Sequence, residues 1–188
     1  VYTVSVDSGL GDGELRLDVV QDPNIQDMQT NALGNGYAFS EHYVLDKTPP
    51  AAEAISVVAP NPTNGSEVTF EVTFSETVEN FDDETDLILT IEGSLAYAGV
   101  DVAPWSAPLT YRVALSGVTG DGTMTLAVRT DSGVQDLAGN ALGSSVTSAQ
   151  AVVDHTAPEV TVTPQTTPYA TPTITGMADD GAGVGVQS

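Results

Sequence analysis

Acidic residues beside glycine and asparagine are the groups of this chain that could do chemistry. The decamers at residues 25–34 and 134–143 both read Q-D, three variable residues and then N-A-L-G. Carboxylate, amide and backbone carbonyl oxygens are the ligands that calcium prefers, about six to eight of them in irregular geometry. An Asp in such a loop can equally accept hydrogen bonds from nearby backbone N–H groups and so shape a turn. Asp136 and its counterpart Asp27 therefore have two possible roles, metal ligand or turn residue.

The net charge limits which classes of molecule the chain can bind. Four basic residues stand against 26 acidic ones, which gives a formal charge of −22 at pH 7. Such a chain repels phosphate backbones and anionic membrane surfaces, so we expect no nucleic-acid partner. No apolar run approaches the roughly 18 residues that a membrane span needs, so we expect no direct membrane insertion.

The composition offers little to catalysis. The chain has no cysteine, and its two histidines, His42 and His155, lie far apart in the sequence. This excludes thiolate metal sites and leaves little basis for a zinc or histidine-based site. No G-x-S-x-G is present, and "GAGVGV" at 181–186 lacks the fingerprint and the following helix of a phosphate loop. We expect the chain not to be an enzyme.

The decamer belongs to a longer internal repeat. A shift of 109 positions aligns residues 2–34 with 111–143, and after a one-residue gap the match resumes at positions 46/154, 48/156 and 50/158. Identities in the longer block fall at positions 2, 4, 11, 12, 13, 17, 19, 22, 26, 27, 31, 32, 33 and 34. An internal repeat of this length indicates a duplicated domain.

The repeat predicts the domain boundaries. We expect residues 1–46 to be the C-terminal half of one domain, 51–154 a complete domain and 159–188 the N-terminal part of a third. Residues 47–50 and 155–158, within "DKTPP" and "DHTAP", are the expected linkers, and proline makes them short and stiff. Because the chain begins inside an expected strand, we expect it to be part of a longer protein.

Apolar residues inside the complete unit recur with a period of two. "EVTFEVTF" at 67–74 places its Val and Phe side chains on one face, and the same alternation recurs at 87–91, 111–115 and 124–128. Further strands are expected near 54–59, 95–102 and 147–153. About seven short strands separated by Gly, Pro, Asn and Asp predict an all-β fold of immunoglobulin-like β-sandwiches. We expect one complete and two partial domains in an elongated array.

Three phrases in this order carry a family resemblance: "VTFSETVENF", "SGVQDLAGNALG" and "DHTAPEVTV". They resemble the bacterial Ig-like (Big-type) tandem repeats of large secreted and cell-surface proteins, including adhesins. "TPYATPTITGMADDGAGV" resembles a related subtype. The resemblance implies an extracellular or cell-surface location, and many such repeats hold calcium at domain junctions. At residues 28–30, "MQT" replaces "LAG", so the first loop lacks the glycine of the second.

Strand order predicts which carboxylates meet. The loop after the strand at 67–74 and the loop after 123–129 leave the same pole of the unit, where the linker enters. The expected ligands at this pole are Asp46, Glu76, Asp82, Asp83, Asp131 and Asp136, with Asp12 from the preceding domain. Those at the next joint are Asp154, Asp179, Asp180 and Asp121. Clustered carboxylates repel by roughly 1 kcal/mol or more per pair, and a divalent cation relieves this.

Other interpretations stay open at this stage. Asp136 can be a turn residue alone, and residues 82–84 can be a solvated acidic face. For function, we expect a structural stalk or spacer of an adhesin-like protein, stiffened by calcium and in contact with neighbouring repeats of the same chain. A second hypothesis is a subunit that self-associates into extracellular filaments or a surface layer. A third is a carbohydrate-binding module that uses Tyr97, Trp105 and Tyr169.

Overall fold

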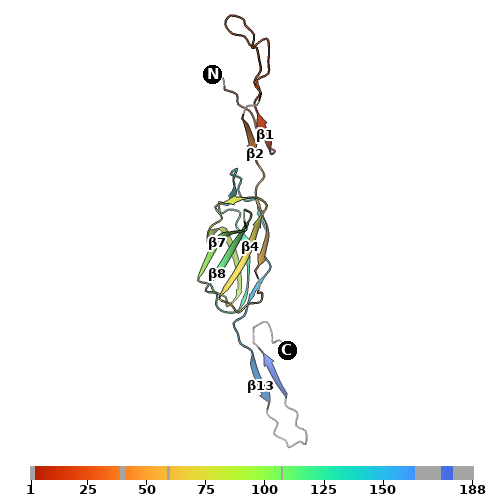
Figure 1. The fold of residues 1–188 in the computed structure, drawn as a ribbon. Coiled ribbons are helices and arrows are strands. Elements are labelled where there is room, and N and C mark those ends of the chain that lie inside the picture. The colour runs from red at the N-terminus through yellow and green to blue at the C-terminus, as the bar shows by residue number, and fades with distance from the viewer. Residues whose placement is uncertain (1–2, 39–40, 59, 107, 164–174, 180–188) are drawn as a thin grey trace, which may run out of the picture. The chain divides into compact units, whose positions relative to one another are not determined.

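The computed structural model describes residues 3–38, 41–58, 60–106, 108–163 and 175–179 (Figure 1). Two compact units are present, one of Val1–Pro49 with Ala138–Asn140 and one of Pro50–Leu137 with Ala141–Ser188. We call them the N-terminal unit and the main unit. The division into three domains that the repeat predicts stays a prediction.

The described residues form strands and one short turn of 3-10 helix. The elements are β1 (Gly13–Arg16), β2 (His42–Leu45), β3 (Ala51–Val57), β4 (Glu67–Phe74), β5 (Val78–Glu79), η1 (Glu84–Asp86), β6 (Leu87–Gly93), β7 (Gly99–Ser106), β8 (Thr110–Ser116), β9 (Gly122–Val128), β10 (Gln135–Asp136), β11 (Ser144–Ser145), β12 (Ala151–Val153), β13 (Glu159–Thr163) and β14 (Thr175–Asp179). The prediction of an all-β chain is confirmed.

The two largest sheets of the main unit pack together. One has the strand order β11-β3-β4-β8-β7 and the other the order β12-β9-β6. β11 joins β3 in parallel, while the other neighbours pair antiparallel. β5 and β10 form a separate two-stranded antiparallel ribbon, in which Asp136 lies opposite Val78. The arrangement is that of a β-sandwich.

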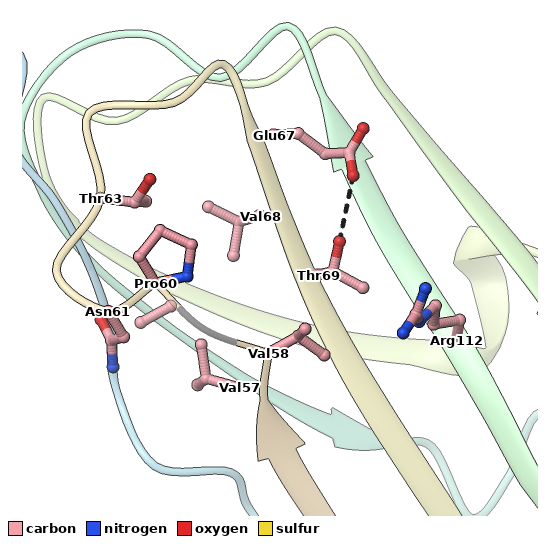
Figure 2. Close-up of a pocket in the computed structure, with 10 residues that line it drawn as sticks. Val57, Val58, Pro60, Asn61, Thr63, Glu67, Val68, Thr69 and Arg112 are labelled. Carbon is pink, nitrogen blue, oxygen red and sulfur yellow. Dashed lines mark hydrogen bonds between the residues drawn. The ribbon is translucent and has the colours of Figure 1, made fainter.

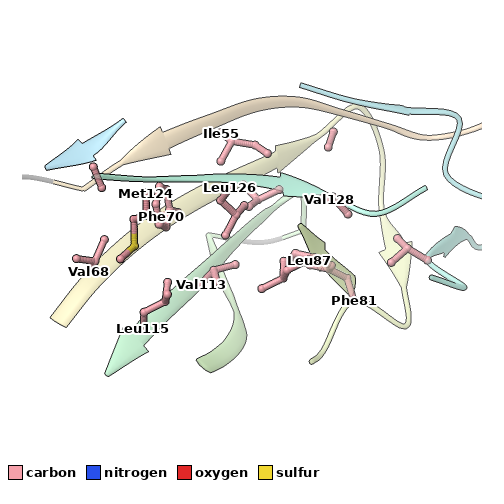
Figure 3. Close-up of a cluster of buried hydrophobic side chains, with 14 of the residues drawn as sticks. Ile55, Val68, Phe70, Phe81, Leu87, Val113, Leu115, Met124, Leu126 and Val128 are labelled. Atoms are coloured by element: carbon pink, nitrogen blue, oxygen red, sulfur yellow. The ribbon is translucent and has the colours of Figure 1, made fainter. Parts of the chain in front are cut away.

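The core lies between the two sheets, and the alternating pattern creates it. Along β4 every second side chain is buried, from Val68 to Phe74, as the period of two predicts. Phe70 and Val113 of one sheet and Met124 and Leu126 of the other are fully buried in one cluster (Figure 3). Burial of such side chains stabilises the fold by about 1.5–3 kcal/mol each before the loss of chain entropy is counted.

An aromatic trio closes one end of this core. The rings of Phe74, Phe81 and Tyr111 meet edge to face, with centroids 5.1 to 5.7 Å apart. The Tyr111 hydroxyl donates a hydrogen bond to the Val78 carbonyl at 3.1 Å, so the one polar atom of the trio is satisfied. This contact ties the turn after β4 to β8 and holds the loop that carries Glu76.

The N-terminal unit contains a two-stranded hairpin whose strands are joined by one long connection, residues 17–41. β1 pairs antiparallel with β2, with Leu15 opposite Tyr43 and Gly13 opposite Leu45. Its apolar side chains are mostly exposed, in contrast to those of the main unit. At the other end of the chain, β13 pairs antiparallel with β14. No helix among the described residues is long and apolar enough to cross a membrane.

Candidate metal-binding carboxylates

Glu76 and Asp136 are two expected ligands that the main unit brings together. Glu76 is half-buried in the turn after β4, and Asp136 is 1 % exposed on β10. A carboxylate oxygen of each lies within 4.8 Å of the other. Two ionised carboxylates within that separation repel by about 3.5 kcal/mol or more at an effective dielectric constant of about 20. A hard cation between them would remove this repulsion.

Asp46 belongs to the N-terminal unit and is half-buried. Its carboxylate accepts a hydrogen bond from the backbone N–H of Thr48 at 3.1 Å. Its backbone carbonyl accepts one from the Asn140 side chain at 3.1 Å, and Asn140 groups with the same unit. The linker aspartate is thus held in place by bonds on both its side chain and its backbone.

The loop Asp of the decamer shapes its own turn in the first copy. The Asp27 carboxylate accepts hydrogen bonds from the backbone N–H groups of Gln29 and Asn31, both at 2.9 Å, and from the Asn31 side chain at 2.8 Å. The Asn31 side chain is the largest cause of the lowered pKa of Asp27. In this copy the carboxylate has the role of a turn residue.

Both copies of the decamer share a backbone framework. Gln26 forms an isolated antiparallel β-bridge with Ala32, and Gln135 forms the equivalent bridge with Ala141. Thr30 adopts φ +66° at the position where Gly139 has φ +90°. The first loop therefore keeps a left-handed residue although its glycine is replaced, at a cost of roughly 1–2 kcal/mol for a residue with a Cβ. The substitution of "LAG" by "MQT" has not abolished this left-handed position.

A second acidic group of the main unit combines Asp82, Asp83 and Asp86. Asp86 is 3 % exposed, and its carboxylate accepts hydrogen bonds from the backbone N–H groups of Asp82 and Asp83 at 3.1 and 3.3 Å. Asp83 in turn accepts from the N–H and the hydroxyl of Thr85, and the hydroxyl is the main reason that its pKa is lowered. These bonds form a capping box around η1.

The sequence prediction missed Asp86. The signal for it is the D-x-x-D spacing of residues 83–86, which is that of a helix N-terminal capping box. Since capping explains why these three carboxylates lie together, this group gives weaker support for a metal than Glu76 with Asp136. Asp131, expected at the same pole, is exposed and lies 3.7 Å from the Arg129 guanidinium.

Asp12 and Asp121 bind the linker that follows their own sheet. The Asp121 carboxylate accepts from the backbone N–H of His155 at 2.5 Å and from the Thr156 hydroxyl at 2.6 Å. Asp12 accepts from the equivalent groups, the N–H of Lys47 at 2.6 Å and the Thr48 hydroxyl at 2.5 Å. We call this arrangement the linker clamp.

The linker clamp affects both carboxylates and the linker backbone. The threonine hydroxyl is the largest cause of the lowered pKa of Asp12 and of Asp121. Asp154 accepts from the Thr156 N–H at 3.0 Å, as Asp46 does from Thr48. Asp179 lies on β14 opposite Glu159, and Asp180 falls outside the described residues. The calcium site expected at the second joint therefore stays a prediction.

Two of the three aromatic residues of the carbohydrate hypothesis, Trp105 and Tyr97, make polar contacts. Trp105 is 55 % exposed, and the Arg112 guanidinium lies 3.3 Å from its ring centroid. Tyr97 donates its hydroxyl hydrogen to Glu84 at 2.5 Å. Tyr169 falls outside the described residues. The guanidinium covers one face of the Trp105 ring, which a sugar would otherwise use.

Both polar and apolar side chains line a pocket of about 240 Å³ in the main unit (Figure 2). Thr69 donates a hydrogen bond to Glu67 at 3.2 Å, and Arg112 donates to Glu71 at the same distance. The Nε atom of Arg112 is buried without a hydrogen-bond partner. Among the described residues, Glu67 is the single carboxylate in the lining of this pocket, so the pair Glu76 and Asp136 is the stronger candidate for a metal site.

A comparison with protein-family models finds no match for this chain, and a comparison with curated proteins finds none either.

Proposed function

We propose that this chain is a run of Ig-like repeats that acts as a structural spacer in a secreted or cell-surface protein. The observation that carries the proposal is the linker clamp. Asp12 and Asp121 each bind the linker after their own sheet through the same backbone and hydroxyl groups. A connection that only had to be flexible would need no such bonds, whereas a spacer needs each linker to leave its domain in one direction.

Strand order supports the Ig-like part of the proposal. Apart from the two-residue strands β5, β10 and β11, the two sheets contain seven strands in the orders β3-β4-β8-β7 and β12-β9-β6. In the letters used for Ig domains these orders read A-B-E-D and G-F-C, the constant-type arrangement. The resemblance of the sequence to bacterial Ig-like repeats points in the same direction.

Calcium is the second element of the proposal. Glu76 and Asp136 bring two carboxylates within 4.8 Å of each other in a chain of net charge −22. Extracellular modules bind calcium at about 10⁻⁴–10⁻³ M, which suits a compartment where calcium is millimolar. Bound calcium would hold the turn after β4 against β10 and reduce motion where the linker enters the unit.

Calorimetry of the whole chain tests the calcium element. We expect millimolar calcium to raise the melting temperature of the main unit and chelator to reverse the rise. Magnesium at equal ionic strength should not reproduce it, which separates coordination from charge screening. Glu76→Gln should remove most of the rise, while Glu79→Gln, an exposed glutamate on the neighbouring β5, should keep it.

The outcomes separate the parts of the proposal. If calcium leaves the melting temperature unchanged, the acidic pair is not a calcium site, although the spacer function stands. Asp46→Asn tests separately whether the linker aspartate is a ligand, as the sequence predicts. For the spacer itself, small-angle scattering of a dilute sample should give an elongated monomer. Concentration-dependent growth of the particle would instead favour a filament subunit.

A further inference from the structure

The N-terminal unit exposes an apolar groove of about 320 Å³. Val4, Val6, Leu15, Leu17 and Tyr43 line it, together with Arg16. Four of these are largely exposed, with Val4 at 59 %, Val6 at 53 %, Leu17 at 50 % and Tyr43 at 67 %. Apolar side chains gathered in one groove of a small unit indicate a surface that has a partner.

The repeat shows what covers these positions in the second copy. A shift of 109 carries Val4, Val6, Leu15 and Leu17 to four side chains that are 0 % exposed, namely Val113, Leu115, Met124 and Leu126. A shift of 108, after the one-residue gap, carries Tyr43 to Ala151, which is 1 % exposed. Every apolar side chain of the groove thus corresponds to a core residue of the main unit.

The two copies match in backbone pairing as well as in sequence. Leu15 pairs with Tyr43 and Gly13 with Leu45, as Met124 pairs with Ala151 and Gly122 with Val153. The register of β1 with β2 is therefore the register of β9 with β12. Since the strands match, the difference in exposure arises from what packs on them.

In the main unit, β4 covers the apolar side chains whose counterparts in the N-terminal unit are exposed. Val68 and Phe70 of β4 lie in the same buried cluster as Met124 and Leu126 (Figure 3). β4 also pairs with β8 along its whole length, from Glu67 opposite Ser116 to Thr73 opposite Thr110. In the N-terminal unit, residues 3–9, which correspond to 112–118, have no strand pairing. The same sequence pattern forms a strand only where β4 and β7 flank it.

We propose that the groove of the N-terminal unit binds the N-terminal half of another repeat, a polypeptide segment with the sequence pattern of residues 51–109. Its β4-like strand would pair with residues 3–7, and its alternating apolar side chains would fill the groove, so that backbone hydrogen bonds give affinity and the apolar alternation gives specificity. The inference rests on the repeat and on burial, and it is independent of calcium.

A seamless graft tests this proposal on the full chain. Residue 1 corresponds to residue 110, so a copy of residues 51–109 joined directly to Val1 restores the order of the repeat. We expect the graft to abolish the binding of a hydrophobic dye to the N-terminal unit and to add a second cooperative melting transition. It should also protect the backbone amides of residues 3–7 from hydrogen exchange. Leu17→Ala should lower the new transition, although it changes little in the ungrafted chain.

A matched control has the same graft with Phe70→Asp and Val72→Asp in the added copy only, which keeps length and linker but cannot fill the groove. It should bind dye as the ungrafted chain does. The proposal is overturned if the intact graft leaves dye binding and amide exchange of residues 3–7 unchanged. It is also overturned if the matched control loses dye binding and gains amide protection as the intact graft does, because the alternating apolar side chains would then not be what fills the groove.

Discussion

The carboxylate of Asp121 accepts a hydrogen bond of 2.6 Å from the hydroxyl of Thr156, which lies 35 residues later in the sequence. The same bond joins Asp12 to Thr48 at 2.5 Å. Neither aspartate is buried, so its contribution depends on protonation and on salt. These two hydrogen bonds therefore make the order of each linker sensitive to pH.

The linker clamp should open in acid. The hydrogen bonds from Thr156 and His155 stabilise the ionised carboxylate, so the pKa of Asp121 lies below its ordinary value of 3.8. Because the pKa is lower in the folded chain than in the unfolded one, the stabilisation is complete above 3.8 and is lost as the pH falls through the lowered pKa. Carboxyl shifts in NMR should report the pKa. The protection of the His155 amide, which is the factor by which its exchange is slower than that of an unstructured peptide at the same pH, should fall over the same pH range.

An Asn substitution provides the control for this titration. Asp121→Asn keeps one acceptor oxygen but removes the titrating group, so the protection of the His155 amide should no longer change with pH in this range. An Asp121 that titrates at or above 3.8 would contradict the clamp.

A pair of leucines at equivalent positions should respond differently to truncation. Leu126→Ala should lower the free energy of unfolding of the main unit by about 2–5 kcal/mol, because the side chain is 0 % exposed and leaves a cavity. Leu17→Ala, at the equivalent position but half exposed, should change stability by about 0.5 kcal/mol or less. Denaturant unfolding followed by Trp105 fluorescence measures the first, and calorimetry of the whole chain covers both. Equal effects would contradict the different burial of the two copies.

Ser148 should be a stabilising hydroxyl. Its Oγ accepts the backbone N–H of Leu126 at 2.9 Å in a buried position and donates to the Ala149 carbonyl at 2.8 Å. Ser148→Ala leaves a buried N–H without a partner, which costs about 1–3 kcal/mol. Ser145 accepts the N–H of Val128 in the same way but is only half-buried, so Ser145→Ala should cost less. Thermal melts of the two variants give the comparison, and a larger loss for Ser145→Ala would refute it.

Gly139 should resist replacement. Its φ of +90° is unfavourable for any residue with a Cβ, although a Cβ there would meet nothing within 4 Å. Gly139→Ala should therefore lower the free energy of unfolding by about 1 kcal/mol through the backbone alone. Leu137→Ala, an exposed neighbour in the loop, is the control and should be close to neutral. Chemical denaturation measures both, and a neutral Gly139→Ala would show that the loop relaxes.

The alternation of residues 67–74 was enough to predict the buried face of β4, because one side chain in two must enter a sandwich core. The strand expected at 95–102 lies instead at Gly99–Ser106. Its register shifts between Pro104 and Ser106, because a proline cannot donate a ladder hydrogen bond. The period of the apolar residues in the sequence does not indicate such an irregularity.

The acidic pair was predictable for a topological reason, whereas the linker clamp was not. Glu76 and Asp136 both follow a strand that ends at the same pole, so strand order alone places them together. Asp12 and Asp121 were expected to be metal ligands, yet their oxygens accept hydrogen bonds from Thr48 and Thr156. A residue 35 or 36 positions away can bind a carboxylate only once the chain has folded back, and no local pattern shows this.

Both partners of the Asp121–Thr156 hydrogen bond lie within one period of the repeat, as do Asp12 and Thr48. A recombination event that inserts or deletes one whole period would therefore leave every remaining clamp with both of its residues. The gene could then lengthen or shorten its product in steps of one domain without a compensating mutation at any linker. The length of the protein would then be set by the number of repeat copies in its gene.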